Sequence, residues 1–250
     1  MKKRKKTLSR IITVISIAVL IVGVILILYC PVSNWLYNNA QNQITAKYDD
    51  TFRLDDNTES ESSGKKDKPT TTSIDLEKLK KDILEYNLGL VESRQANLGT
   101  NGIFDKAVLN LSDYGFQDNI YGYVKIPKID VNMPIYLGAN DYNMSLGASH
   151  LGSTSIPYGG KDTHSVIAGH CGYGTLNHFR YLENLSKGDD VIIGTPFKKL
   201  KYKVIRKSII NPKDTQEFKI REGEDLVTLF TCYPYPKSTY RLCLICERKK

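Results

Sequence analysis

The sequence predicts a mainly β domain, a barrel or a sandwich with few helices, that follows a helical region and a single membrane helix. The main observation is a series of short β-branched and aromatic runs, separated by turn residues, that begins near Tyr121. These runs are Tyr121 to Ile126, Met133 to Tyr136, Ser165 to Ala168, Val191 to Ile193, Leu200 to Ile210, Asp225 to Thr231 and Leu242 to Cys246. We expect one helical segment, around Leu176 to Leu185, to interrupt them. Regular short strands of this kind are typical of all-β barrels and sandwiches.

The second observation is an apolar run, residues 11–30, that directly follows a basic tail, residues 1–10. As a helix, Ile11 to Tyr29 would span about 28 Å, which matches the hydrocarbon core of a bilayer. A cleaved signal peptide would have a shorter apolar stretch that ends in small residues, whereas this one ends with Leu28 and Tyr29. We therefore expect an uncleaved single-pass anchor. Basic residues stay on the cytoplasmic side, so the rest of the chain should be extracytoplasmic.

The charge and the cysteines exclude two further classes. The chain has a net charge of +8, but six of these charges belong to the basic tail, and no acidic residue precedes Asp49. The other residues carry no basic stripe interleaved with aromatic residues, so no nucleic-acid partner is expected. Five cysteines are an odd number in a domain large enough to bury a core, so we expect at least one free thiol and no disulfide framework.

Residues 31–75 are predicted to form a juxtamembrane segment and a flexible linker. Trp35, Leu36 and Tyr37 suit the membrane interface. The stretch from Asp55 to Ser73 has almost no apolar residue, which is typical of a linker.

Residues 76–118 are predicted to form a helical region and a possible lid, ahead of the strand-rich domain at 119–250. Ser73 or Asp75 can cap a helix that ends near Gly89. Its apolar positions follow the helical period and are Leu76, Leu79, Ile83, Leu84 and Leu88.

Three residues near predicted strand ends can carry chemistry. Cys232 ends the run from Asp225 and precedes two prolines, which cannot continue a central strand. His170 follows the run from Ser165 in a glycine-rich surround. Arg241 opens the last strand, so a hairpin could return its guanidinium beside the thiol. His150, His164 and His178 are interpreted as structural.

Together these three side chains form a complete apparatus for acyl transfer. A thiolate can attack a carbonyl, an imidazole can protonate the leaving amine, and a guanidinium can stabilise the tetrahedral intermediate. The order of His before Cys excludes papain-like proteases, and the caspase signature around the cysteine is absent.

The motifs around these residues resemble those of the sortase family. Residues 228–232 (TLFTC) match its Thr-Leu-x-Thr-Cys motif, Gly169-His170 its Gly-His pair, and Arg241 its arginine. Residues 122–129 (GYVKIPKI), 134–136 (PIY) and 163–170 (THSVIAGH) extend the match in collinear order from about Ile120 to Glu247. The resemblance implies an eight-stranded β-barrel.

The resemblance also implies the reaction and the partners. Sortases cleave an LPXTG-like sorting signal of surface proteins or pilins between Thr and Gly, form a thioacyl enzyme, and pass the acyl group to an amine. That amine belongs to a pilin lysine or to a peptidoglycan precursor. The resemblance implies a substrate-binding role for Thr231 of the motif and no cofactor.

Several pieces resemble class C, pilin-polymerising sortases: Pro157 to Gly160, Thr163 to Ser165, and the helical region around Tyr86. Class C enzymes carry an Asp-Pro-aromatic lid, and here the corresponding residues 102–105 (GIFD) lack the proline. Phe104 and Asp105 are the possible lid residues, with Asp105 a potential partner of Arg241. A housekeeping, cell-wall-anchoring role stays open.

Other interpretations remain. Cys243 and Cys246 form a CxxC, but residues three apart on a strand point to opposite faces, so no metal site is expected. Cys171 could take part in a reversible disulfide. The same three residues could serve a membrane-anchored surface cysteine endopeptidase, or could be structural in a non-catalytic binding module.

Overall fold

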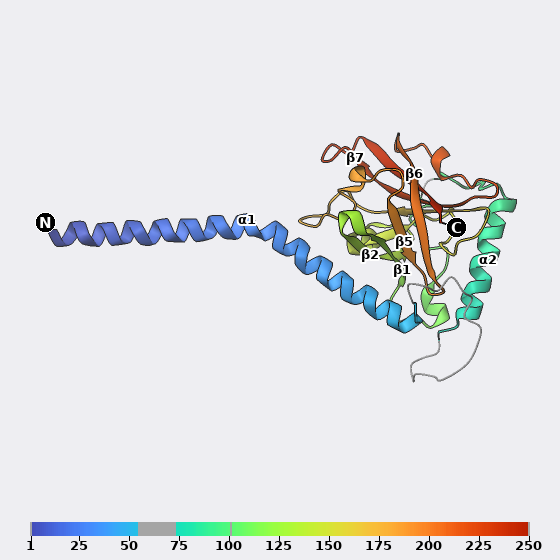
Figure 1. Cartoon of the computed structure of the whole chain (residues 1–250), viewed down its shortest axis with the longest axis horizontal. Helices are drawn as coiled ribbons and strands as arrows, with labels where there is room; N and C mark the ends of the chain where they lie inside the picture. Colours follow the sequence, from blue (N-terminus) through green and yellow to red (C-terminus); the bar gives the residue numbers. More distant parts are fainter. Residues whose placement is uncertain (1, 55–73, 101, 250) are drawn as a thin grey trace.

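The structure, a computed structural model, describes residues 2–54, 74–100 and 102–249. Its centre is a closed barrel of eight strands in the spatial order β1-β2-β3-β4-β7-β8-β6-β5 (Figure 1). The predicted mainly β fold and the eight-stranded barrel are thereby confirmed. The strands are β1 (Ile120–Ile126), β2 (Val131–Leu137), β3 (Ala148–His150), β4 (Thr163–Ala168), β5 (Asp190–Gly194), β6 (Lys199–Ile210), β7 (Asp225–Tyr233) and β8 (Tyr240–Arg248).

The strands place alternate side chains inside and outside the barrel. From β7 and β8, Val227, Leu229, Leu242 and Leu244 join the interior core. The residues between them lie on the outer face, where Leu226, Phe230, Cys243 and Ile245 belong to a second apolar cluster under the loops. Cys243 and Cys246 therefore belong to different clusters, as the strand period predicts.

Helix α1 (Lys2–Phe52) differs from the predicted division at residue 31, because it continues without a break through the juxtamembrane segment. Pro31 lies inside it, and the helix bends there, so that its second half lies against the barrel (Figure 1). Its first half is long and apolar enough to cross a membrane. The predicted linker, Asp55 to Ser73, lies outside the described residues.

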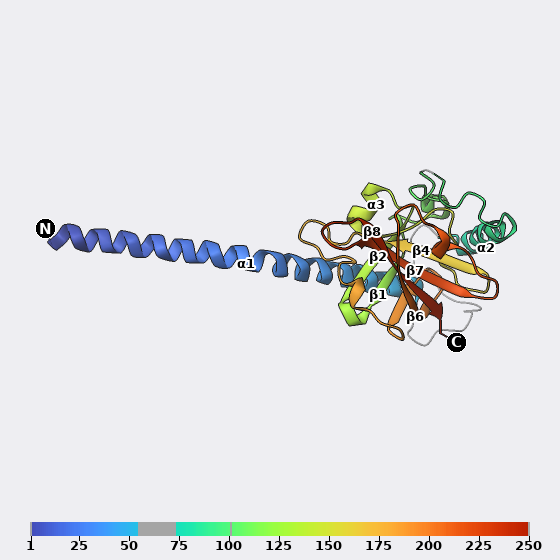
Figure 2. The ribbon, with the colours of Figure 1, turned by 90° about the horizontal axis from the view of Figure 1, so that it is seen from above.

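The second half of α1 is helical because the barrel stabilises it. Asn132 of β2 donates hydrogen bonds to Asn42 Oδ1 (2.7 Å) and Thr45 Oγ1 (2.8 Å). Asp49 accepts a hydrogen bond from Tyr123 (2.8 Å) and forms an ion pair with Lys199 (2.9 Å), which connects α1 to β1 and β6. Figure 2 shows this half of α1 running beside the barrel.

Helix α2 (Leu76–Glu92) agrees with the predicted helix but extends beyond Gly89. Asp75 is the N-cap and accepts from the Lys78 amide (3.0 Å). Leu79 and Ile83 bury their side chains against the barrel with Tyr121. Asn87 also forms two hydrogen bonds with the backbone of residue 156.

The helix expected around Leu176 to Leu185 is absent from this part of the described chain, and that prediction was wrong. The segment is a series of turns with a 3₁₀ helix, η3 (Leu182–Asn184). Phe179, Leu182 and Leu185 are buried three residues apart, which matches a 3₁₀ period better than an α period. A short helix that was not predicted, α3 (Asp141–Leu146), lies between β2 and β3. The other short 3₁₀ helices are η1 (Leu111–Tyr114), η2 (Pro127–Ile129) and η4 (Gln216–Phe218).

Candidate active site

Cys232 and Arg241 are direct partners in the antiparallel pairing of β7 with β8. Since opposite residues of such a pair have their Cβ atoms about 5 Å apart on the same face of the sheet, the thiol and the guanidinium are neighbours. Both residues are partly exposed. The hairpin predicted from the sequence does return Arg241 beside the thiol.

Cys232 is also the accessible cysteine of the barrel. Among the four cysteines beyond α1, Cys171, Cys243 and Cys246 are buried, and Cys232 is not. Burial raises the pKa of the Cys171 thiol, and raises that of Cys243 to about 12. Burial also raises the pKa of the Cys246 thiol, so all three thiols stay protonated at neutral pH and away from substrates.

His170 reaches the same place from β4, which pairs in parallel with β7. The last paired residues are Ala168 and Phe230, and the Gly169 amide donates to the Phe230 carbonyl (3.0 Å). His170 thus leaves β4 alongside the end of β7 that carries Cys232. Gly169 has a steric role, because a Cβ atom there would lie 2.6 Å from the ring of Phe179.

The imidazole of His170 is partly exposed, and neither ring nitrogen has a hydrogen-bond partner among the described residues. It stacks on Tyr173, with ring centroids 5.0 Å apart. Burial lowers the pKa of His170 below its usual value, and the Asp141 carboxylate opposes this shift. The neutral imidazole is therefore favoured, and its nitrogens are available for proton transfer.

Arg241 is held by its own loop. Its Nη1 donates to the carbonyls of Ser238 (3.0 Å) and Tyr240 (2.9 Å). Within the described residues, the other donors of the guanidinium have no partner. They can bind a carbonyl oxygen or an oxyanion next to the thiol.

The expected substrate-binding role of Thr231 stays a prediction. Its side chain is buried, and its hydroxyl donates to the Gly169 carbonyl (2.7 Å). This hydrogen bond connects β7 to the residue that precedes His170. The geometry therefore assigns Thr231 to holding the two strands together.

The predicted lid residues lie on the outer face of the same strands. Phe104 stands edge-on to Phe218 (6.2 Å between ring centroids), and Phe218 stands edge-on to Phe230 (5.2 Å). The Phe104 carbonyl accepts hydrogen bonds from the amides of Ala139 (2.8 Å) and Gly152 (3.3 Å). Asp105 is exposed, and in the described structure it forms no ion pair with Arg241.

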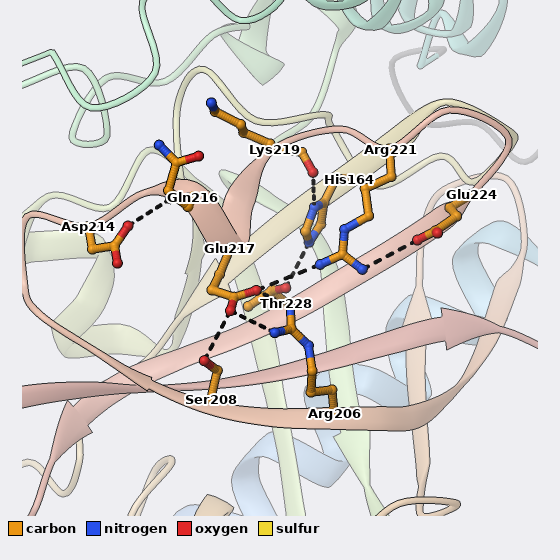
Figure 3. A network of polar contacts seen from close by, with 10 residues as sticks. All are labelled: His164, Arg206, Ser208, Asp214, Gln216, Glu217, Lys219, Arg221, Glu224 and Thr228. Atoms are coloured by element: carbon orange, nitrogen blue, oxygen red, sulfur yellow. Dashed lines mark hydrogen bonds and ion pairs between the residues drawn. The ribbon is translucent and has the colours of Figure 1, made fainter.

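Phe218 belongs to the connection between β6 and β7, residues 211–224, which a polar network fastens to the barrel (Figure 3). Glu217 accepts from Ser208 (3.0 Å) and pairs with Arg206 through both of its carboxylate oxygens. His164 donates from Nδ1 to the Lys219 carbonyl (2.8 Å), so its Nε2 accepts from the Thr228 hydroxyl (2.7 Å).

Residues far away in the sequence also support the site. Asn34 of α1 donates to the Thr175 carbonyl and accepts from the Asn177 amide (2.9 Å), both in the segment that follows His170. Tyr37 stacks on His178 at 5.4 Å, and His178 lies 6.4 Å from His170. These contacts were not predicted, because no local pattern in residues 31–52 indicates them.

The fold and the site together describe a β-barrel protein equipped for thiol-dependent acyl transfer. A family model described as the sortase domain matches residues 124–249, about half of the chain. The chain therefore belongs to the sortase family, whose members are cysteine transpeptidases.

Curated relatives include two sortases. Sortase A of Streptococcus agalactiae serotype III (strain NEM316) is 25% identical over 179 residues, which cover 70% of this chain and 68% of that protein. Sortase D of Bacillus subtilis (strain 168) is 24% identical over 158 residues, covering 63% of this chain and 76% of that protein.

Similar chains among solved structures include class C sortases. Sortase C1 of pilus island 1 of GBS has a TM-score of 0.64 and 28% identity, covering 71% of this chain and 90% of that chain. The Clostridium perfringens sortase C with its C-terminal cell wall sorting motif has a TM-score of 0.62 and 30% identity, covering 83% of this chain and 98% of that chain. Within the family, this chain is thus most like class C.

Proposed function

We propose that this protein is a membrane-anchored transpeptidase that cleaves an LPXTG-like sorting signal and transfers the acyl part to an amine. The observation that carries the proposal is the register that places Cys232 opposite Arg241, with His170 arriving from the parallel strand. Membership of the sortase family and the likeness to class C structures support it.

In the first half of the proposed reaction, the sulfur of Cys232 attacks the Thr carbonyl of the signal, and the thiol proton passes to His170. Arg241 stabilises the negative charge that develops on the carbonyl oxygen. His170 then protonates the nitrogen of the leaving Gly, the Thr–Gly bond breaks, and a thioester on Cys232 remains.

In the second half, an amine attacks this thioester and gives a proton to His170. The C–S bond breaks, the new amide is released, and Cys232 recovers its proton. The acceptor is a pilin lysine or the amine of a peptidoglycan precursor. The class C likeness favours pilus assembly, since the GBS neighbour is described by its pilus island.

The proposed topology has the basic residues 1–10 in the cytoplasm, the apolar half of α1 in the membrane and the barrel outside. The length and apolar character of α1 support a single anchor. The distribution of basic residues supports the orientation.

We also propose that the segment around Phe104 acts as a lid. Phe104 packs on Phe218, which packs on Phe230, so the segment covers the apolar outer face beside Cys232. A Cβ atom on Gly138 would lie 2.6 Å from the Ala107 amide nitrogen, so the backbone of this segment lies directly against the barrel. A substrate that binds along this face would displace the segment.

The decisive experiment traps the intermediate. The full-length protein is incubated with a sorting-signal peptide and analysed by mass spectrometry, with and without an added amine. We expect an acyl adduct on Cys232 and, with amine, an amide product. Free acid alone at saturating amine would indicate a surface cysteine endopeptidase. The absence of an adduct on an otherwise folded protein would indicate a binding module.

A further inference from the structure

The exposed tyrosines of the barrel gather at one end. Among the described residues beyond α1, the tyrosines with exposed side chains are Tyr142, Tyr173, Tyr181, Tyr235 and Tyr240, which are 42% to 72% exposed. They come from α3, from the segment after β4 and from the β7–β8 connection. Other tyrosines of the barrel, such as Tyr121, Tyr123 and Tyr202, are buried.

These three segments adjoin one another at the candidate active site. Tyr173 stacks on His170, and Arg180 lies over the ring of Tyr235 at 3.9 Å. Tyr240 is the register partner of Tyr233, one pair beyond Cys232 and Arg241. The tyrosines therefore surround the end of the barrel at which the site opens.

Helix α1 holds this end close to the place where its apolar half ends. Immediately after Pro31, Asn34 forms its two hydrogen bonds with the segment after β4, and Tyr37 donates to the Leu146 carbonyl of α3 (3.3 Å). Figure 1 shows the β7–β8 connection, the segment after β4 and α3 on the side of the barrel that faces the apolar half of α1.

We propose that this tyrosine-rich end of the barrel rests on the outer surface of the lipid bilayer that α1 crosses. The inference rests on the membrane anchor of the proposed function. Tyrosine is enriched at membrane interfaces, because its ring can enter the apolar boundary while its hydroxyl stays hydrated. Trp35, which is 66% exposed on α1, and Leu146 of α3 lie in the same zone.

The charged residues at this end indicate that the tyrosine rings, and not attraction to anionic lipids, would supply most of the binding to the bilayer. Arg180, Lys237 and Arg241 are largely offset by Asp141 and Glu183, so the face carries only a small positive charge. Binding should therefore tolerate salt, unlike that of a polybasic segment. A consequence is that the cleft around Cys232 opens at the membrane surface and receives substrates that are themselves held in the membrane.

The test uses the full-length protein in vesicles of phosphatidylcholine and phosphatidylglycerol that contain a lipid with a photoreactive headgroup. After illumination, labelled peptides are mapped by mass spectrometry. We expect several-fold more label on the three tyrosine-bearing segments than on a peptide with exposed apolar residues elsewhere, Leu84 and Leu88 of α2. Equal labelling of both sets would overturn the proposal and leave this face free for a protein partner.

Two double variants sharpen the result. Tyr142→Ser with Tyr235→Ser should reduce the label on the catalytic end several-fold and leave the label on α1 unchanged. Leu84→Ser with Leu88→Ser is the matched control and should change neither. Unchanged labelling in the tyrosine variant would also overturn the proposal. Since the readout is labelling, a protein that transfers acyl groups but fails this test keeps its proposed function, and the reverse also holds.

Discussion

His164 of β4 and His170, which lies two residues beyond the end of that strand, differ in every property that matters for chemistry. His164 is buried, has a partner on each ring nitrogen, and its pKa is lowered to about 4 by burial. His170, six residues later, is partly exposed, and its nitrogens have no partner among the described residues. Their neighbours on β7 differ in the same way, because Thr228 is buried and Cys232 is accessible.

The outer side of β4, β7 and β8 is therefore divided between two tasks. At the end of the face near residue 164, satisfied polar groups hold the β6–β7 connection in place (Figure 3). At the other end, the thiol, the imidazole and part of the guanidinium are left without protein partners, which makes them available to a substrate. A residue type alone does not distinguish the two ends; the number of satisfied hydrogen bonds does.

The largest expected effect is that of Cys232→Ala. Loss of the covalent nucleophile should reduce cleavage and transfer by at least about a thousandfold. The unfolding free energy should change little, since the side chain is partly exposed. Thr228→Ala is the matched change at the other end. It leaves the Nε2 atom of His164 without its donor, so it should lower stability by about 1–3 kcal/mol and keep turnover at permissive temperature.

Peptide cleavage assays and urea unfolding of both variants check this pair. Residual activity of Cys232→Ala above about a thousandth of wild type would place the nucleophile elsewhere.

Arg241→Lys should be the next largest lesion. The ammonium keeps the charge but cannot reproduce the directed hydrogen bonds of the guanidinium, so turnover should fall on the order of a hundredfold. Arg206→Lys makes the same chemical change in the Glu217 network and should reduce stability with near-normal turnover. If Arg241→Lys retains normal turnover, Arg241 supplies only general positive potential.

The buried histidines predict a loss of stability in acid. The pKa values of His150 and His164 are lowered by burial to about 4, below the usual 6.5. Their stabilising contribution is complete above pH 6.5, falls as the pH decreases toward 4 and is lost below it, because only the unfolded chain binds the proton easily in that window. Each histidine accounts for up to about 3 kcal/mol.

Urea unfolding between pH 7 and 4.5 measures the slope of the unfolding free energy against pH. His164→Gln should make the slope clearly shallower, whereas His170→Gln should change it less, because His170 is partly exposed. Equal slopes in wild type and His164→Gln would show that His164 already binds its proton in the folded state.

The smallest expected effect concerns the lid. Phe104→Ala should increase the rate of Cys232 alkylation a few-fold, since it removes the ring that packs on Phe218 beside the cleft. Asp105→Ala should not change this rate, because the carboxylate is exposed and unpaired with Arg241 in the described structure. The double variant should behave like Phe104→Ala. Unchanged alkylation in all three, at unchanged stability, would mean that the cleft is already open, as expected for a housekeeping sortase.

Local patterns in the sequence predicted the β-rich domain, the long apolar helix and the candidate site residues Cys232, His170 and Arg241. Strand period, helix period and short motifs are properties of neighbouring residues, so they can be read without the fold. Even the return of Arg241 beside Cys232 follows from the short connection between two predicted strands.

The directions in which several of these residues face, and the contacts that support them, depend on the tertiary structure. Thr231 belongs to the motif but points into the barrel, because strand alternation sends it inward beside the accessible Cys232. Residues 32–52, predicted only as a juxtamembrane segment, continue the helix, and residues 176–185 form turns instead of a helix. In each case the local conformation is stabilised by contacts with residues distant in the chain, such as Asn132 with Asn42 and Phe179 with the core. No local sequence pattern contains these contacts.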